Sequence, residues 1–157
     1  MIYLTTGGCV LTSLNVYLRQ LKQPLWGAGY HGQLGLEAKR KKCEMLPVQI
    51  NFNEAVIQIS CGGFHTGLLT EQGKVYTWGD GEKGQLGNLD AKDRMHATPH
   101  LVESLVHINR ATIVDLSCGQ YHTAAVSAKG DLYTWGSGKY GQIGLGDRSP
   151  RRSPCKV

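Results

Sequence analysis

The sequence lacks the features that mark a membrane protein, a disulfide-rich secreted domain or a common enzyme class. No apolar run approaches the roughly 20 residues that cross a bilayer, so we expect no membrane contact. The five cysteines are an odd number and include no C-x-x-C pair, which argues against a disulfide scaffold and favours a reducing compartment, the cytoplasm or the nucleus. The sequence shows no Ser-His-Asp order, no paired carboxylates and no Walker pattern. We therefore predict a protein that is not an enzyme and needs neither cofactor nor metal.

Strong charge of one sign is also missing. The formal net charge is +5 over 157 residues, which a solvated basic surface explains without nucleic acid. Binding to chromatin would need a more basic face, so nucleic acid and chromatin are not expected partners of this segment.

Glycine is what the sequence has in excess. The chain contains 21 glycines, against an average usage of about 7%. They stand among aromatic and β-branched residues at fixed spacings, so the segment is not of low complexity. Many tight turns between short strands would need this pattern, which favours an all-β fold.

A glycine-rich segment occurs three times without a gap. Its copies are residues 25–35 (LWGAGYHGQLG), 77–87 (TWGDGEKGQLG) and 134–144 (TWGSGKYGQIG). All three tryptophans of the chain, Trp26, Trp78 and Trp135, occupy the same position, 52 and then 57 residues apart. The chain is therefore built from repeats of about 50 residues.

Two further landmarks recur with the tryptophan. Residues 59–66 (ISCGGFHT) match residues 116–123 (LSCGQYHT), and in both copies the cysteine lies 17 residues before the tryptophan. A proline follows each tryptophan after 19 to 21 residues, and the longer second period places an insertion around residues 103–110. Apolar alternation predicts strands at 55–60, 64–70 and 75–78 with a turn at 72–73, which is typical of a propeller blade.

The composite pattern resembles the regulator of chromosome condensation (RCC1) repeat: a CGxxHT block, a G-x-[VL]-Y-T-W-G strand and a GxxGQ[LI]G turn. The resemblance covers residues 25–157 and implies a propeller of seven blades. The chain supplies about three, so we expect a partial, open β-propeller with blade boundaries near 47–98 and 99–153. Residues 1–24 keep only Cys9 of the pattern, so they are either a degenerate first half-blade or a non-native leader. Within them, residues 12–23 have the alternative of a short amphipathic helix.

Three patterns suggest chemistry that the repetition argues against. The sequence GxGxxG follows a strand in all three copies, but one dinucleotide does not need three fingerprints, so we interpret these segments as turns. The pairs Cys61/His65 and Cys118/His122 have C-x3-H spacing, but an extended strand would hold the two side chains about 13 Å apart, too far for one zinc ion. We expect each cysteine to pack as a small apolar group and each histidine to bond to neighbouring backbone. The tryptophans are expected in the core.

Residues that depart from the repeat are the candidates for partner binding. They are the basic run Lys39, Arg40, Lys41 and Lys42, and the charged residues of the insertion, Glu103, His107 and Arg110. A second basic segment surrounds Ser149-Pro150 and Ser153-Pro154 and is phosphorylatable in principle.

Three functions remain open at this stage. Propellers present variable rims on a rigid scaffold, which predicts a protein-interaction module. The resemblance adds regulation of a small GTPase as a guanine-nucleotide exchange factor, with docking on chromatin, although no residue here matches a GTPase-contacting wedge. It also adds the substrate-recruiting propeller of a larger enzyme such as a HECT-type ubiquitin ligase.

Overall fold

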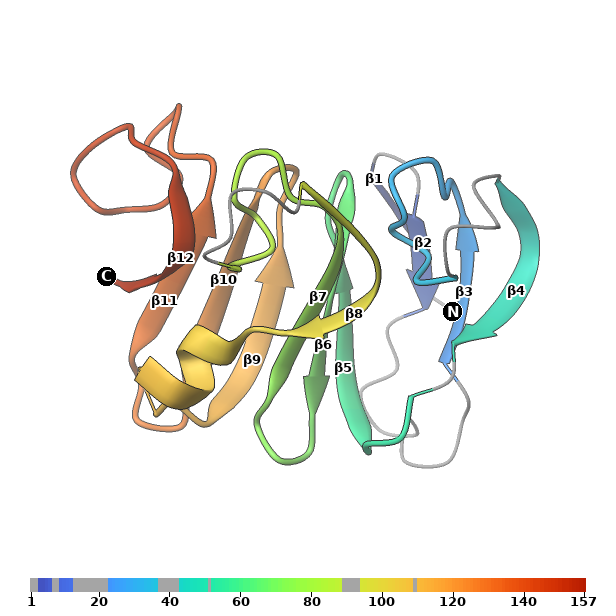
Figure 1. Ribbon diagram of the computed structural model, residues 1–157, viewed down its shortest axis with the longest axis horizontal. Helices are drawn as coiled ribbons and strands as arrows, with labels where there is room; N and C mark the ends of the chain where they lie inside the picture. Colours follow the sequence, from blue (N-terminus) through green and yellow to red (C-terminus); the bar gives the residue numbers. More distant parts are fainter. Residues whose placement is uncertain are drawn as a thin grey trace.

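The computed structural model describes residues 3–6, 9–12, 23–36, 43–50, 52–88, 94–108 and 110–157. Within these ranges the chain forms three sheets, each of four antiparallel strands, that stand side by side in sequence order (Figure 1). The prediction of an all-β, partial propeller is confirmed, with one sheet for each blade.

The strands of each sheet follow one another along the chain. The first blade consists of β1 (Tyr3–Thr6), β2 (Cys9–Thr12), β3 (Gln23–Gly27) and β4 (Glu44–Ile50). The second blade consists of β5 (Val56–Cys61), β6 (His65–Thr70), β7 (Val75–Asp80) and β8 (Met95–Leu101). The third blade consists of β9 (Ile113–Cys118), β10 (His122–Ser127), β11 (Leu132–Gly136) and β12 (Arg151–Lys156).

The three predicted strands of the second blade are confirmed, and a fourth completes each sheet. This fourth strand holds the recurring proline: Pro47 in β4, Pro99 in β8 and Pro154 in β12. It lies at the edge of its sheet, where a residue without an N–H is tolerated. The expected boundaries near 47–98 and 99–153 therefore run through β4, β8 and β12, while the sheets themselves begin at Val56 and Ile113.

The ten residues 13–22 lie outside the described part of the chain, and with them most of the helix considered for residues 12–23. Thr12 ends β2, and Gln23 and Pro24 begin β3.

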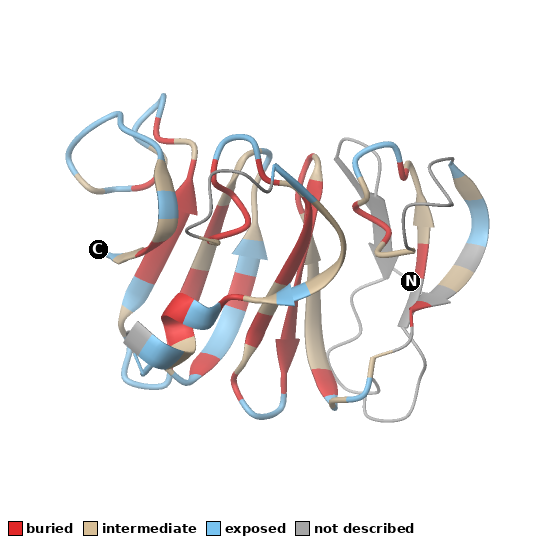
Figure 2. Cartoon of the chain, viewed as in Figure 1, coloured by how far each residue is buried: buried red, intermediate tan, exposed pale blue. Residues whose placement is uncertain are grey.

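The core lies between the sheets. One apolar cluster joins Leu25 and Leu34 of the first blade to Leu68 and Trp78 of the second. A larger cluster joins the second blade to the third, and its members include Leu69, Val75, Val102, Tyr133 and Trp135. Trp78 and Trp135 are completely buried, whereas Trp26 is half-buried. Buried segments run along the strands of the second and third blades (Figure 2). The blades are therefore held together mainly by apolar contact between neighbouring sheets.

A pair of hydrogen bonds joins each of the first two glycine-rich turns to the following blade. The carbonyl oxygen of Gln85 accepts from the indole nitrogen of Trp135 at 2.8 Å and from the hydroxyl of Thr123 at 2.8 Å. One blade earlier, the carbonyl oxygen of Gln33 accepts from Trp78 at 2.9 Å and from Thr66 at 2.8 Å. The shared tryptophan, threonine and glutamine positions thus form one contact between blades, which we call the latch.

Glycine is needed where the turn meets the indole. Gly87 has a φ of 73°, in the left-handed region that L side chains rarely adopt. A Cβ at this position would lie 2.9 Å from the indole nitrogen of Trp135. Any side chain would push the turn off the tryptophan that it covers.

His65 adds a second connection to the latch between the second and third blades. Its Nε2 lies 2.8 Å from the hydroxyl oxygen of Thr123. Because the Thr123 hydroxyl gives its proton to Gln85, the histidine must donate, so Nε2 carries the ring proton. The expected backbone partner is thus replaced by a hydroxyl 58 residues away. The expected extended strand is also wrong, since Cys61 ends β5 and His65 begins β6 across a tight turn.

Thr123→Val is expected to destabilise the chain more than Thr66→Val. Both changes remove a hydroxyl that bonds to a glutamine carbonyl, and in both cases the tryptophan still satisfies that carbonyl. Only Thr123→Val also leaves the buried Nε2–H of His65 without an acceptor, which costs about 1–3 kcal/mol. Urea unfolding of the two variants measures the difference, and equal losses would contradict the assigned role of His65.

The chain should lose stability between pH 7 and pH 5 because of His65. Burial lowers the pKa of His65 to about 3, with a smaller contribution from His122. The unfolded chain binds this proton below about pH 6.5 while the folded chain excludes it, so acid favours unfolding. The expected loss is about 2 kcal/mol at pH 5 relative to pH 7. Urea midpoints measured across this range test it, and His65→Gln should flatten the pH dependence.

Candidate protein-binding surface

The blades have two ends with different structures. At one end, which we call the loop end, the glycine-rich turns and the long connection to β12 emerge (Figure 1). At the other, the hairpin end, lie the β6–β7 and β10–β11 hairpins and the connection from the second blade to the third (Figure 1). Side chains at either end are available to a partner without disturbing the sheets.

The insertion predicted around residues 103–110 forms a short π-helix, η1 (Ser104–Ile108), at the hairpin end. It is anchored rather than loose, because Leu105 is buried in the apolar cluster between the second and third blades. The N–H of Leu105 donates to the carbonyl of Val102, and the N–H of Ala111 donates to the carbonyl of Leu105 at 2.8 Å. The insertion is therefore a shaped surface feature with one side in the core.

The predicted partner-binding residues of this segment, Glu103, His107 and Arg110, are all exposed. Arg110 has a φ of 47°, unusual for a residue other than glycine and a form of backbone strain that is often found at functional sites. It lines a small pocket at the hairpin end, together with Thr112, Ser127 and Lys129. Asp131 and Tyr133 line the pocket as well, so two cationic side chains, one carboxylate and three hydroxyl groups border one hollow beside η1.

The basic run Lys39, Arg40, Lys41 and Lys42 lies outside the described residues, so its relation to η1 stays a matter of prediction. Within the described part, the candidate surface rests on the insertion and on the hairpins beside it.

A polar cluster that the sequence did not point to lies near the hairpin end of the second blade. The hydroxyl of Tyr76 donates to Glu54 Oε1 at 2.5 Å, and Lys74 Nζ lies 3.1 Å from the same oxygen. Burial and the neighbouring carboxylate raise the pKa of Tyr76 to about 12, and the tyrosine bond lowers the pKa of Glu54. On the third blade, Lys156 pairs with Asp131 at 2.7 Å. This end of the molecule therefore carries both signs of charge, in fixed positions.

A row of aromatic rings follows the loop end. Phe64 and Tyr121 stack with their centroids 5.0 Å apart, and His31 meets Phe64 edge-on at 5.0 Å. Phe64 and Tyr121 hold equivalent positions in the CGxxHT block, directly before the histidine. That equivalence is the sequence signal from which the row could have been predicted. The rings bridge neighbouring blades and add stacking energy to the latch.

The two C-x3-H pairs do not gather into a metal centre. Within the described ranges, no group of three or more His, Cys, Asp or Glu side chains is arranged to hold a metal ion. In the same ranges, no helix combines the length and apolar character that a membrane span requires.

The family description "Regulator of chromosome condensation (RCC1) repeat" matches residues 25–69, 72–126 and 129–157. A second description of the same repeat matches residues 56–85 and 113–142. The first two matches start at or just before the third strand of one blade and end in the second strand of the next, so the repeat unit spans the junction between blades.

Several curated proteins are similar in sequence. The ultraviolet-B receptor UVR8 of Arabidopsis thaliana is 38% identical over 132 residues, covering 84% of this chain and 29% of that protein. The probable E3 ubiquitin-protein ligase HERC4 of Rattus norvegicus is 41% identical over 134 residues, covering 84% of this chain and 12% of that protein. The chain thus spans less than a third of the length of these relatives.

Solved structures share the fold. Prp20p of Saccharomyces cerevisiae, described with its binding properties to Gsp1p and histones, matches with a TM-score of 0.80 at 20% identity, covering 99% of this chain and 37% of that one. Human WBSCR16 matches with a TM-score of 0.71 at 24% identity, covering 85% and 34%. With the family description matching most of its length and the blades and latch in place, the chain belongs to the regulator of chromosome condensation (RCC1) repeat family.

Proposed function

We propose that this chain is a protein-interaction module that meets its partner at the hairpin end, through the insertion that contains η1. The observation that carries the proposal is the form of this insertion: its apolar side is fixed in the core while Glu103, His107 and Arg110 face solvent. A surface of this kind is preorganised, so binding a partner requires little further ordering.

The insertion is specific to one junction of the chain. Five residues, 51–55, connect β4 to β5, whereas eleven residues, 102–112, connect β8 to β9. The shorter connection is sufficient to join two blades, so the additional residues are not needed to span the junction. Their charged side chains, and the pocket lined by Arg110 and Lys129, are suited to a protein surface of mixed charge.

Two narrower roles have support of different kinds. Sequence likeness to HERC4 supports a recruiting propeller in a ubiquitin ligase, although this chain covers only 12% of that protein. Likeness to Prp20p, which is described with Gsp1p, supports a small GTPase as the partner, but 20% identity extends to the fold alone. The recruiting role is therefore the better supported of the two. Either role would place the chain in the cytoplasm or the nucleus.

The proposal predicts that charge removal on the insertion abolishes partner capture. The variant combines Glu103→Ala, His107→Ala and Arg110→Ala, which remove exposed groups and should leave the fold unchanged within about 0.5 kcal/mol. The matched control, Lys83→Ala with Lys139→Ala, removes exposed charges at the loop end. Tagged full chains are used for affinity capture with quantitative mass spectrometry. Partners retained by the control and lost from the insertion variant support the proposal; a set unchanged in both variants contradicts it.

Exchange activity has its own test. Release of a fluorescent guanine nucleotide is followed for a panel of small GTPases, with and without the chain. Since no residue here matches a GTPase-contacting wedge, we expect no acceleration. Faster release with any member of the panel would instead assign the exchange role.

Leu105→Ala should destabilise the third blade and disorder the insertion together. A buried leucine truncated to alanine typically loses about 2–5 kcal/mol, because it leaves a cavity as well as losing apolar contact. Glu103→Ala, two residues away and exposed, should stay within about 0.5 kcal/mol. Thermal unfolding of both variants provides the comparison. A loss for Leu105→Ala no larger than that for Glu103→Ala would mean that η1 is not anchored in the core.

A further inference from the structure

The last nine residues of the chain contain the same short pattern twice. Residues 149–152 read Ser-Pro-Arg-Arg and residues 153–156 read Ser-Pro-Cys-Lys. Each places proline directly after a serine and a basic residue three positions after it. Proline-directed serine/threonine kinases select substrates of this form, reading the proline and the following cation. Because the two sites follow one another directly, the surrounding structure determines which of the two serines a kinase can reach.

The structure separates the two serines. Ser149 is exposed and lies in the connection that leads from the third glycine-rich turn to β12, outside any strand. Ser153 is half-buried within β12, which is paired with β11, and its carbonyl accepts from the thiol of Cys155. A kinase binds its substrate as an extended, separate segment. Ser149 lies before β12, so binding to a kinase requires only the first residues of that strand, Arg151 and Arg152, to separate from their neighbours. Ser153 lies inside β12 and requires more of the strand to open.

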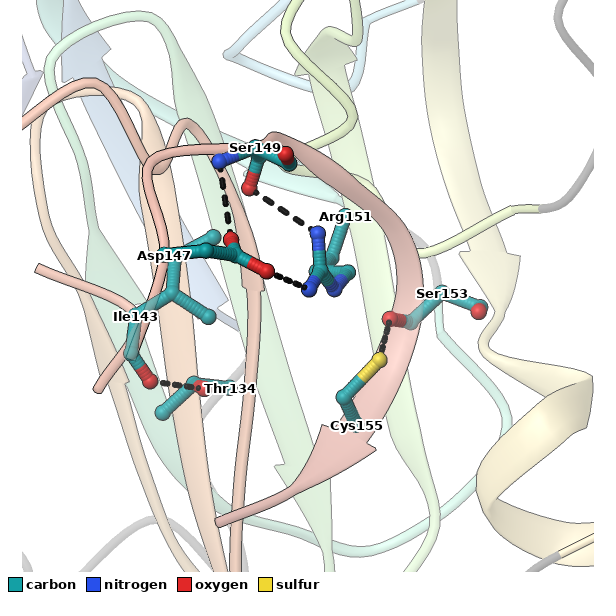
Figure 3. Close-up of polar contacts among 7 residues, drawn as sticks. All are labelled: Thr134, Ile143, Asp147, Ser149, Arg151, Ser153 and Cys155. Atoms are coloured by element: carbon teal, nitrogen blue, oxygen red, sulfur yellow. Dashed lines mark hydrogen bonds and ion pairs between the residues drawn. The ribbon is translucent and has the colours of Figure 1, made fainter. Parts of the chain in front are cut away.

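Charged groups already surround Ser149 (Figure 3). Its N–H donates to Asp147 Oδ1 at 2.9 Å, and its carbonyl accepts from Arg151 Nη1 at 3.2 Å. The second terminal nitrogen of the guanidinium, Nη2 of Arg151, lies 2.7 Å from Asp147 Oδ2. The loop therefore presents the serine beside a guanidinium that is shared between a carboxylate and a backbone carbonyl.

We propose that Ser149 is a phosphorylation site for a proline-directed serine/threonine kinase. With ATP as co-substrate, the Ser149 hydroxyl oxygen forms a bond to the γ-phosphorus while the bond from that phosphorus to the β–γ bridging oxygen breaks. ADP leaves, and the hydroxyl proton goes to the catalytic base of the kinase. Phosphoserine adds a charge of about −1.5 to −2 next to Arg151, so it competes with Asp147 for the guanidinium.

The site lies where the third blade touches the second at the loop end. Arg152 donates to the carbonyl of Glu82 at 3.3 Å, and a Cβ on Gly84 would lie 2.7 Å from the carbonyl oxygen of Arg151. This contact is at the opposite end of the blades from η1 (Figure 1). The modification therefore concerns a different surface from the insertion, and its test is independent of the capture experiment.

The full chain and a peptide of residues 143–157 are incubated with a cyclin-dependent kinase and ATP, and phosphate is mapped by mass spectrometry. In the folded chain, Ser149 should be modified at least about tenfold faster than Ser153, because Ser153 requires a longer stretch of β12 to open. In the peptide, residues 151–156 have no β11 to pair with, so the two serines should be modified at similar rates.

Variants complete the test. Ser149→Ala should remove most phosphate from the folded chain, and Ser153→Ala should leave it in place. Arg152→Ala, which removes the basic residue three positions after Ser149, should slow modification at Ser149. Equal modification of both serines in the folded chain, unchanged incorporation in Ser149→Ala, or modification of the peptide but not of the folded chain would each overturn the proposal.

Discussion

One backbone carbonyl in each glycine-rich turn determines how the blades stack. The carbonyl of Gln85 accepts from both Trp135 and Thr123 of the next blade, so its position fixes where that blade lies. The turn must keep its length and its glycines to deliver this carbonyl, since a Cβ on Gly87 would collide with the indole. Tryptophan, threonine, glutamine and glycine recur together because they are parts of one contact, although they belong to two different sheets. The contact repeats because the second blade donates to the Gln33 carbonyl of the first blade and presents its own Gln85 carbonyl to the third.

The third turn is folded in the same way although no fourth blade engages it in this structure. The side chain of Gln142 accepts from the N–H of Tyr140 at 2.8 Å, as Gln85 does from Lys83 at 2.9 Å. The turn is therefore preorganised by local bonds before a neighbour docks. The apolar side chains of the third sheet are less buried than those of the second. Leu132 and Val157 are 38% and 51% exposed. The equivalent residues of the second blade, Val75 and Val102, are 0% and 2% exposed. Local sequence shapes the turn, but burial comes only from the neighbouring blade.

The difference between contacts within a turn and contacts between blades explains which features the sequence could predict. Strands at 56–61, 65–70 and 75–80 and the turns between them follow from alternation and glycine, which act over a few residues. The bond from His65 to Thr123 joins residues 58 positions apart, and no local pattern encodes it. The edge strands with proline were placed as boundaries, because proline is a stronger signal for a break than for an edge. Counting residues between landmarks predicts where the insertion lies, but the burial of Leu105 depends on apolar contact with two sheets that no local pattern shows.

The latch also determines where the chain can vary. Between the tryptophan and the end of its turn, the length of the chain is fixed because the glutamine carbonyl must reach the next blade. All three copies of this segment are eleven residues long. The connections between blades at the hairpin end are less constrained in length. The N–H of Ile113 donates to the carbonyl of Gly73, and the residues before it take no part in the latch. The connection can therefore grow from five residues to eleven without moving a tryptophan. An insertion placed there changes the surface of the hairpin end while leaving the stacking of the blades intact, so this fold can vary that surface without losing the latch.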